Sequence, residues 1–196
     1  MTPRPRKVSD EQIFMATMRA MSRLGPGELT LAEIAGEAGV TAGALVQRFG
    51  SKRELLLALS RLAAEGGGDF LRDLTRQRRS PLAALREYAE CFAHLAESPA
   101  ALARNLAYLQ IDLTDEDFRA NLLAQSRAAR EAIAELLAAA VTKGELARDT
   151  DVARLARTVE TALSGSLITW ATYREGTPAA WLADDVEAVV RPHRTA

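Results

Sequence analysis

The sequence of 196 residues contains one cysteine, Cys91, so no disulfide can form within the chain. We expect Cys91 to be a buried structural thiol on a helix rather than a redox sensor. No apolar run reaches the about 18 residues that suggest a membrane span, and the N-terminus lacks the apolar core of a signal peptide. These absences predict a cytoplasmic protein with no membrane partner.

The sequence patterns of metal and covalent chemistry are also missing. His94 and His193 are far apart, and neither an H-E-x-x-H pattern nor a cysteine pair occurs. The run Gly66-Gly67-Gly68 lacks the Lys-Ser/Thr of a phosphate-binding loop. We therefore expect no metal, no cofactor and no enzymatic activity. An α-helical enzyme is a rival interpretation, for which no constellation of site residues is visible.

Aromatic residues make up only 5% of the chain, and regular β-branched alternation is scarce. Alanine, leucine and arginine abound, which favours an all-α fold. With 48% hydrophobic and 26% charged residues, the composition is that of a soluble protein able to bury a core. The formal net charge of −1 argues against indiscriminate nucleic-acid binding by the whole surface.

What the sequence does contain is a pair of short predicted helices around a tight turn, at residues 31–50. Thr30 and Glu33 have the spacing of a capping box at the first helix. Gly39 can end that helix in the left-handed conformation, and Thr41 is the N-cap candidate for the next. The pattern indicates a helix-turn-helix.

In the second of these helices, Val40, Leu45 and Phe49 are expected to face inward, which leaves a small, polar or basic face without acids. Such a helix fits the major groove of DNA, where Gln can pair with adenine and Arg with guanine or a phosphate. A solvated helical hairpin in an ordinary bundle explains the spacing equally well. The candidate DNA-contacting residues here are Thr41, Ala42, Gly43, Ala44, Val46, Gln47 and Arg48.

The stretch resembles the helix-turn-helix of the tetracycline-repressor (TetR) family of transcriptional regulators. The resemblance covers roughly the first third of the chain, and residues 13–25 resemble the family's first helix. It implies that Lys52, in the first turn of the following helix, holds a DNA phosphate. The matching residues are Leu31, Ile34, Ala35, Ala38, Gly39, Val40, Gly43, Leu45, Phe49, Ser51, Lys52, Glu54 and Leu55.

Departures from the family pattern lie on the face expected to meet DNA. The family usually has Lys, Ser or Arg in place of Ala42, and Thr or Ser in place of Ala44. It usually has Tyr in place of Val46, and often His in place of Gln47. These departures motivate an alternative function: a helical dimerisation or interaction module with weakened DNA binding.

Before the first helix, Arg4, Arg6 and Lys7 form a basic arm without acids. Such an arm can reach phosphates or the minor groove, and a merely solvated terminus is an equally good interpretation.

We place the domain boundary between a DNA-binding domain, residues 1–65, and an effector-binding and dimerisation domain, residues 66–196. Gly66-Gly67-Gly68 stands at this boundary, and we hypothesise that it is a flexible joint, because each glycine costs roughly 1 kcal/mol in a helix interior. The further helices are expected at residues 9–24, 51–65, 69–76, 81–97, 99–111, 114–143, 152–173 and 178–191.

The last two predicted helices carry two adjacent seams, one of them rich in small residues. Both seams can serve the core of the monomer. The resemblance to the TetR family instead implies a four-helix dimer interface. The residues expected in that interface are Leu155, Ala162, Gly165, Thr169, Leu182, Val186 and Val189.

An effector pocket between helices of the second domain is expected to be apolar, with a few polar groups. Candidate ligand-binding residues are Cys91, His94, Asn105, Tyr108, Gln110, Trp170 and Tyr173. We expect a homodimeric regulator that binds a double-stranded DNA operator, a repressor released when a small apolar effector favours the dimer conformation that cannot bind DNA.

Overall fold

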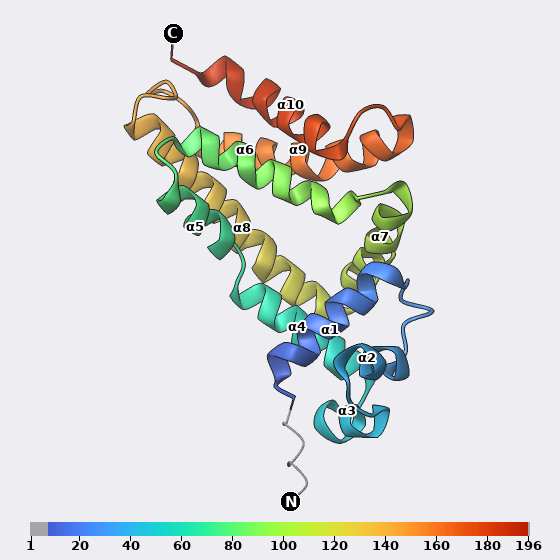
Figure 1. Ribbon diagram of the computed structural model, residues 1–196. Coiled ribbons are helices and arrows are strands. Elements are labelled where there is room, and N and C mark those ends of the chain that lie inside the picture. The colour runs from blue at the N-terminus through green and yellow to red at the C-terminus, as the bar shows by residue number, and fades with distance from the viewer. Residues whose placement is uncertain (1–7, 196) are drawn as a thin grey trace, which may run out of the picture. The chain divides into compact units, whose positions relative to one another are not determined.

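The computed structural model describes residues 8–195 and confirms the all-α prediction. Arg4, Arg6 and Lys7 of the basic arm lie outside the described residues. Within residues 8–195 there is no β-strand, only an isolated bridge between Leu146 and Arg194. The helices are α1 (Asp10–Arg23), α2 (Leu31–Ala38), α3 (Ala42–Phe49), α4 (Lys52–Glu65), α5 (Asp69–Gln77), α6 (Pro81–Phe92), α7 (Pro99–Thr114), α8 (Glu116–Thr142), α9 (Val152–Tyr173) and α10 (Pro178–Val190), with 3₁₀ turns at Ala93–Ala96 and Arg191–His193 (Figure 1).

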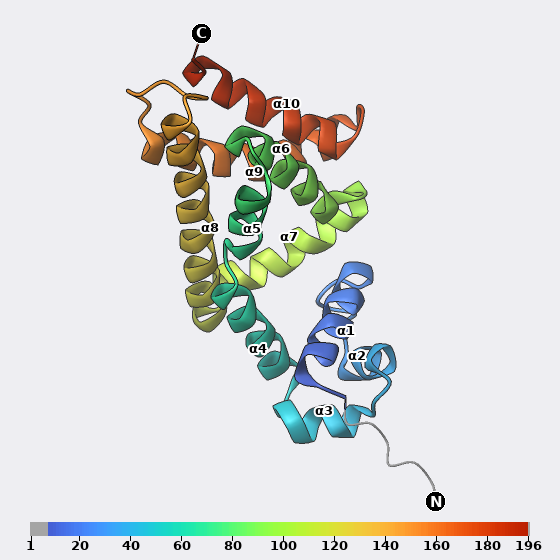
Figure 2. The same cartoon turned by 60° about the vertical axis from the view of Figure 1, so that its left-hand side comes forward.

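The predicted ends of the first helices are confirmed, because they depend on residues three or four apart. Ser9 and Gln12 form a capping box at α1. The hydroxyl of Thr30 accepts a hydrogen bond from the Glu33 N–H at α2, and α2 ends at Gly39 with φ of 67°. The hydroxyl of Thr41 accepts a hydrogen bond from the N–H of Ala44 and caps α3. Because α2 ends at Ala38 and α3 begins at Ala42, a short turn joins the two helices (Figure 2).

Two compact units make up the chain. The N-terminal unit contains residues 8–62 together with Arg104–Arg119, and the C-terminal unit contains Ala63–Ala103 and Ala120–Ala196. The boundary at Leu62 lies near the expected one at residue 65. However, most of α7 and the first residues of α8 belong to the N-terminal unit, whereas the sequence analysis places them in the second domain.

The added segment of the N-terminal unit completes its core. Tyr108 of α7 is only 8% exposed and packs in a cluster with Ile13, Leu29 and Leu45. Its hydroxyl donates a hydrogen bond of 2.8 Å to the carbonyl of Leu24, and burial raises its pKa to about 12. The segment Arg104–Arg119 therefore contributes a buried aromatic ring and a hydrogen bond to the core of the N-terminal unit.

A charged cluster holds the α7–α8 corner to α4 in the same unit. The guanidinium of Arg53 donates to Asp117 at 2.8 Å and to both carboxylate oxygens of Asp115 at 2.8 and 2.9 Å. It also lies 5.6 Å from the centre of the Phe118 ring. These hydrogen bonds raise the pKa of Arg53, and Arg53 in turn lowers the pKa of Asp115.

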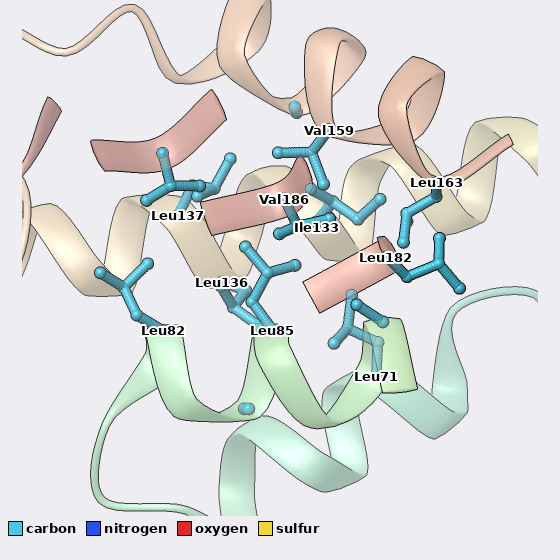
Figure 3. Close-up of a cluster of buried hydrophobic side chains, with 14 of the residues drawn as sticks. Leu71, Leu82, Leu85, Ile133, Leu136, Leu137, Val159, Leu163, Leu182 and Val186 are labelled. Carbon is cyan, nitrogen blue, oxygen red and sulfur yellow. The ribbon is translucent and has the colours of Figure 1, made fainter. Parts of the chain in front are cut away.

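The C-terminal unit is built around one cluster of apolar side chains. In this unit α9 and α10 lie side by side, and α10 also packs on α6. In Figure 3, side chains of α5, α6, α8, α9 and α10 point toward one another. They are Leu71, Leu82, Leu85, Ile133, Leu136, Leu137, Val159, Leu163, Leu182 and Val186.

Close packing, rather than flexibility, accounts for Gly67 and Gly68, which lie between α4 and α5. Gly68 has φ of 85°, and a Cβ atom there would lie 2.7 Å from the carbonyl oxygen of Ala128 and 2.9 Å from the Cβ of Ala132. A Cβ on Gly67 would lie 3.0 Å from the Cβ of Ala128. The chain thus crosses α8 at a distance that only glycine permits, and the sequence-based hypothesis of a flexible joint does not fit this packing.

Some helix ends differ from those expected. The helix predicted over 81–97 ends at Phe92 and continues as the 3₁₀ turn Ala93–Ala96, and α7 extends past Ile111 to Thr114. Within residues 8–195, the longer helices are too polar to cross a membrane.

Candidate nucleic-acid interface

The position of α3 in the N-terminal unit is set by its apolar side. Leu45 is 1% exposed, and Val40 and Phe49 pack against the same core, as the sequence predicts. Phe49 also contacts Phe14 of α1, with ring centroids 5.9 Å apart. Because α3 has only eight residues, these contacts rather than helix propensity hold it in place.

The opposite side of α3 is open to solvent. Thr41, Gly43, Ala44 and Gln47 are exposed, and Val46 is 47% exposed. Ala42 is half-buried, because it also packs against the core cluster. Small side chains at the start of a helix allow the backbone to approach a groove closely, and Gln47 offers both a donor and an acceptor.

Arg48 differs from its neighbours on α3, because two of its three guanidinium nitrogens already have partners within the protein. Its Nε lies 2.5 Å from Oδ1 of Asp10, and its Nη1 donates a hydrogen bond of 2.6 Å to the carbonyl of Val8. The guanidinium also lies 5.8 Å from the centre of the Phe49 ring. In this structure Arg48 connects α3 to the start of α1.

Lys52 is also engaged within the protein. Its Nζ donates hydrogen bonds of 2.7 Å to the carbonyl of Leu29 and 3.1 Å to the carbonyl of Pro26. Both carbonyls belong to the loop between α1 and α2, so the ammonium group ties the start of α4 to that loop. A phosphate placed here would have to share the ammonium group with these two carbonyls.

A protein-family profile matches the segment that contains this candidate interface. Residues 13–59, which include α2, α3 and the start of α4, match the profile of the family described as "Bacterial regulatory proteins, tetR family". This segment is therefore similar to the N-terminal domain of the tetR family. The matched stretch contains the whole of α3, with its exposed side.

Solved structures extend the tetR-family likeness over nearly the whole chain. A TetR transcription regulator from Haloarcula marismortui is 19% identical, with a TM-score of 0.76 over 95% of this chain and 98% of that one. Thermus thermophilus FadR, a TetR-family transcriptional repressor solved with lauroyl-CoA, is 25% identical, with a TM-score of 0.60 over 96% of each chain. SmeT, the repressor of a Stenotrophomonas maltophilia multidrug efflux pump, is 20% identical, with a TM-score of 0.68 over 96% and 92%.

The chain therefore has the fold of tetR-family transcriptional regulators. A comparison with curated protein sequences found no match.

Of the residues expected in a dimer interface, three belong to the core of the C-terminal unit instead. Leu155, Leu182 and Val186 are at most 4% exposed, so they are not available to a partner. Each contributes to the cluster of buried side chains that α9 and α10 share with the other helices. The heptad-like spacing identified a buried seam correctly but could not show which helix covers it.

The remaining small residues of α9 lie on its open side. Ala162 and Gly165 are half-buried, Thr169 is exposed, and a Cβ on Gly165 would meet no atom within 4 Å. Ile168, which the sequence analysis did not single out, is 50% exposed beside them. Val189 of α10 is half-buried against the core.

The candidate ligand-binding residues do not form one group. Asn105, Tyr108 and Gln110 belong to the N-terminal unit, contrary to the expectation of a pocket in the second domain. Tyr108 is a core residue, and its hydroxyl is hydrogen-bonded to Leu24.

The other candidates lie in the C-terminal unit. Trp170 is 6% exposed and its indole donates to the carbonyl of Gly176 at 3.4 Å, whereas Tyr173 is 63% exposed and stacks on Trp181. His94 is exposed and Cys91 is half-buried, so the thiol is less buried than expected. A hollow of about 640 Å³ in this unit is lined by other residues, among them Arg154, Thr158 and His193.

Among residues 8–195, no cluster of three His, Cys, Asp or Glu side chains is arranged to hold a metal ion. The site residues missed by the sequence analysis are Asp10, which pairs with Arg48, and the carbonyls of Pro26 and Leu29, which hold Lys52. Asp10 is visible in the sequence as an acid in the first turn of a helix, but nothing local reveals that its partner lies on another helix.

Proposed function

We propose that this protein is a homodimeric transcriptional regulator whose α3 helices read the major groove of an operator. In this proposal the N-terminal unit binds DNA, and the C-terminal unit carries the dimer interface and the effector site. The observation that supports DNA binding best is the exposed, acid-free side of α3, held on a buried Leu45 within a match to the tetR family. Operator half-sites are expected about one helical turn apart, or slightly more.

Selection of bound sequences from random duplex DNA tests this function. The purified protein should enrich a palindromic sequence, and its affinity should fall as salt concentration rises. Recovery of no sequence above background would overturn the proposed function.

Gln47→Ala should change which bases are preferred, whereas Lys52→Ala should weaken binding to all sequences alike. The reason is that contacts to base edges specify the sequence, while contacts that position the protein do not. We expect Gln47→Ala to cost roughly 1–3 kcal/mol at one or two positions of the operator. Repeating the selection with both variants checks this, and a changed preference for Lys52→Ala alone would contradict the orientation of α3.

The dimer is proposed to form through the open side of α9, where Ala162, Gly165 and Thr169 allow a second helix to approach closely. The exposed Ile168 adds apolar area to the same side. Leu155, Leu182 and Val186, which the sequence analysis expected in the interface, are not part of this proposed interface, because their side chains are buried in the monomer.

Gly165→Leu should convert the dimer to a monomer without unfolding it. A leucine side chain finds open space in the single chain but would occupy the place of the partner helix, and overpacking typically costs about 1–3 kcal/mol or more. Light scattering at micromolar concentration gives the mass, and circular dichroism checks the fold. Ala153→Leu, at an exposed position near the start of α9, is the matched control and should remain dimeric.

Repression, and release by an effector, complete the proposal. They are supported by two structures with the same fold that are described as repressors, one of them in complex with lauroyl-CoA. The abundance of alanine and leucine in the C-terminal unit favours an apolar effector. An effector that binds the DNA-incompetent conformation more tightly would weaken operator binding by the ratio of the two affinities.

A helical interaction module with weakened DNA binding is the second candidate function. Ala42, Ala44 and Val46 favour it, because none of these side chains can hydrogen-bond to DNA. Retention on heparin distinguishes the two functions: a DNA-binding protein should be retained and released by salt, whereas the module should pass through.

A further inference from the structure

Arg48 was expected to contact DNA, yet it is the residue of α3 whose donors are most fully used inside the protein. Nε faces Asp10 at 2.5 Å, Nη1 donates to the carbonyl of Val8 at 2.6 Å, and the side chain is 31% exposed. To reach a base or a phosphate with these donors, Arg48 would have to leave both partners.

The place of Arg48 along α3 points the same way. In helix-turn-helix proteins the N-terminal residues of the recognition helix meet the base edges. Arg48 lies seven residues after Thr41, which corresponds to about 10 Å along the helix axis at 1.5 Å per residue. It therefore occupies the end of α3 that is farther from the expected base contacts.

Arg48 also acts together with Phe49, its neighbour in the chain. The two residues contact the same helix, α1, through Asp10 and Phe14 respectively. A planar guanidinium can face a carboxylate with one nitrogen and donate to a carbonyl with another, which suits the ion pair with Asp10 and the hydrogen bond to Val8. Together the ionic and aromatic contacts fix the C-terminal end of α3 against the first turns of α1.

We propose that Arg48 is a positioning residue that holds α3 at the angle needed for groove binding, and that it does not itself read or bind DNA. This inference rests on the proposed DNA-binding function. Asp10 is then a required partner, although an acid near DNA would ordinarily weaken binding.

The variant Asp10→Asn distinguishes a positioning role of Arg48 from a DNA-binding role, because the two roles predict opposite changes in DNA affinity. If Arg48 positions α3, loss of the carboxylate loosens the helix and weakens binding. If Arg48 binds DNA, loss of the carboxylate frees the guanidinium and removes a repulsive charge, so binding tightens. Glu11→Gln, at the next residue of α1, is the control for the repulsion alone, because Glu11 is also exposed in the first turn.

The experiment measures the dissociation constant of the full chain for its selected duplex across a range of salt concentrations. Asp10→Asn and Arg48→Met should each weaken binding about three- to tenfold, the size expected for losing charge-assisted hydrogen bonds. The double variant should bind no worse than the weaker single variant, because both changes break the same contact. Arg48→Lys should be as weak as Arg48→Met, since an ammonium on a shorter-reaching stem cannot reproduce the two-way contact.

A positioning role leaves two further readouts unchanged, whereas loss of a direct DNA contact would change one of them. Base preference should be the same in all variants, and the slope of log affinity against log salt should match that of the parent. The proposal is overturned if Asp10→Asn binds more tightly than Glu11→Gln, or if Arg48→Met lowers the salt slope by about one while Arg48→Lys preserves it. Failure of the parent protein to select any duplex would instead refute the proposed function itself.

Discussion

Replacing Gly68 by alanine should lower the free energy of unfolding by about 2–5 kcal/mol. The left-handed conformation costs an alanine about 1–2 kcal/mol, and overpacking against α8 adds about 1–3 kcal/mol. The added methyl group would fall 2.7 Å from the carbonyl oxygen of Ala128, and backbone cannot move aside as a flexible side chain can. In a chain of this length, the melting temperature should fall by roughly 4–20 °C.

Gly36→Ala is the matched control for this prediction. Gly36 lies inside α2, and a Cβ there would meet no atom within 4 Å, so alanine should stabilise the helix by up to about 1 kcal/mol. Thermal and urea unfolding of both variants measures the difference. If Gly68→Ala has the same melting temperature as the parent protein, close packing against α8 does not require a glycine there, and a flexible joint becomes the better explanation.

Tyr108→Ala should lose about 3–5 kcal/mol of stability, as large-to-small changes of buried aromatic residues do. The change removes a ring that is 8% exposed in the core of the N-terminal unit, together with the hydrogen bond to Leu24. Because α3 is held by the same core, operator binding should be lost in parallel. A fragment of residues 1–65, which lacks Tyr108 altogether, should show no cooperative unfolding transition.

Tyr108→Phe distinguishes the ring from its hydroxyl. Phenylalanine keeps the apolar contact and loses only the hydrogen bond to Leu24, so its cost should be about 0.5–1.5 kcal/mol. Urea denaturation followed by circular dichroism gives both values. Normal stability in Tyr108→Ala, or cooperative folding of the 1–65 fragment, would mean that the segment 104–119 does not support the N-terminal unit.

Sequence reasoning worked where the decisive interactions are local. The caps at Thr30 and Thr41 and the stop at Gly39 depend on residues within one or two turns, and each appears in the structure. The inward side of α3 followed from apolar spacing in the same way. These features predicted the pair of helices around a tight turn, and composition predicted the all-α fold.

Sequence reasoning failed where distant segments meet. The partner of Arg48, Asp10, lies on another helix. The hydrogen bond from Tyr108 to Leu24 joins residues that are far apart in the sequence, and helical spacing does not predict such contacts. Gly68 is a further example. A glycine that interrupts a helix gives the same sequence pattern whether the backbone there is flexible or packed closely against α8. Leu155 was assigned to a dimer interface from the resemblance to the TetR family, because spacing alone shows that a helix face is covered but not which helix covers it.

The N-terminal unit is discontinuous in sequence, and this has a consequence for how such regulators can be made and recombined. During synthesis the unit lacks part of its core until residues 104–119 have left the ribosome, by which time the segment 63–103 has already emerged. A chimera joined at residue 65 would leave Tyr108, Asp115 and Asp117 behind and separate them from Leu24 and Arg53. Transplanting operator specificity between relatives therefore requires moving two segments of the chain, or matching the second to the first.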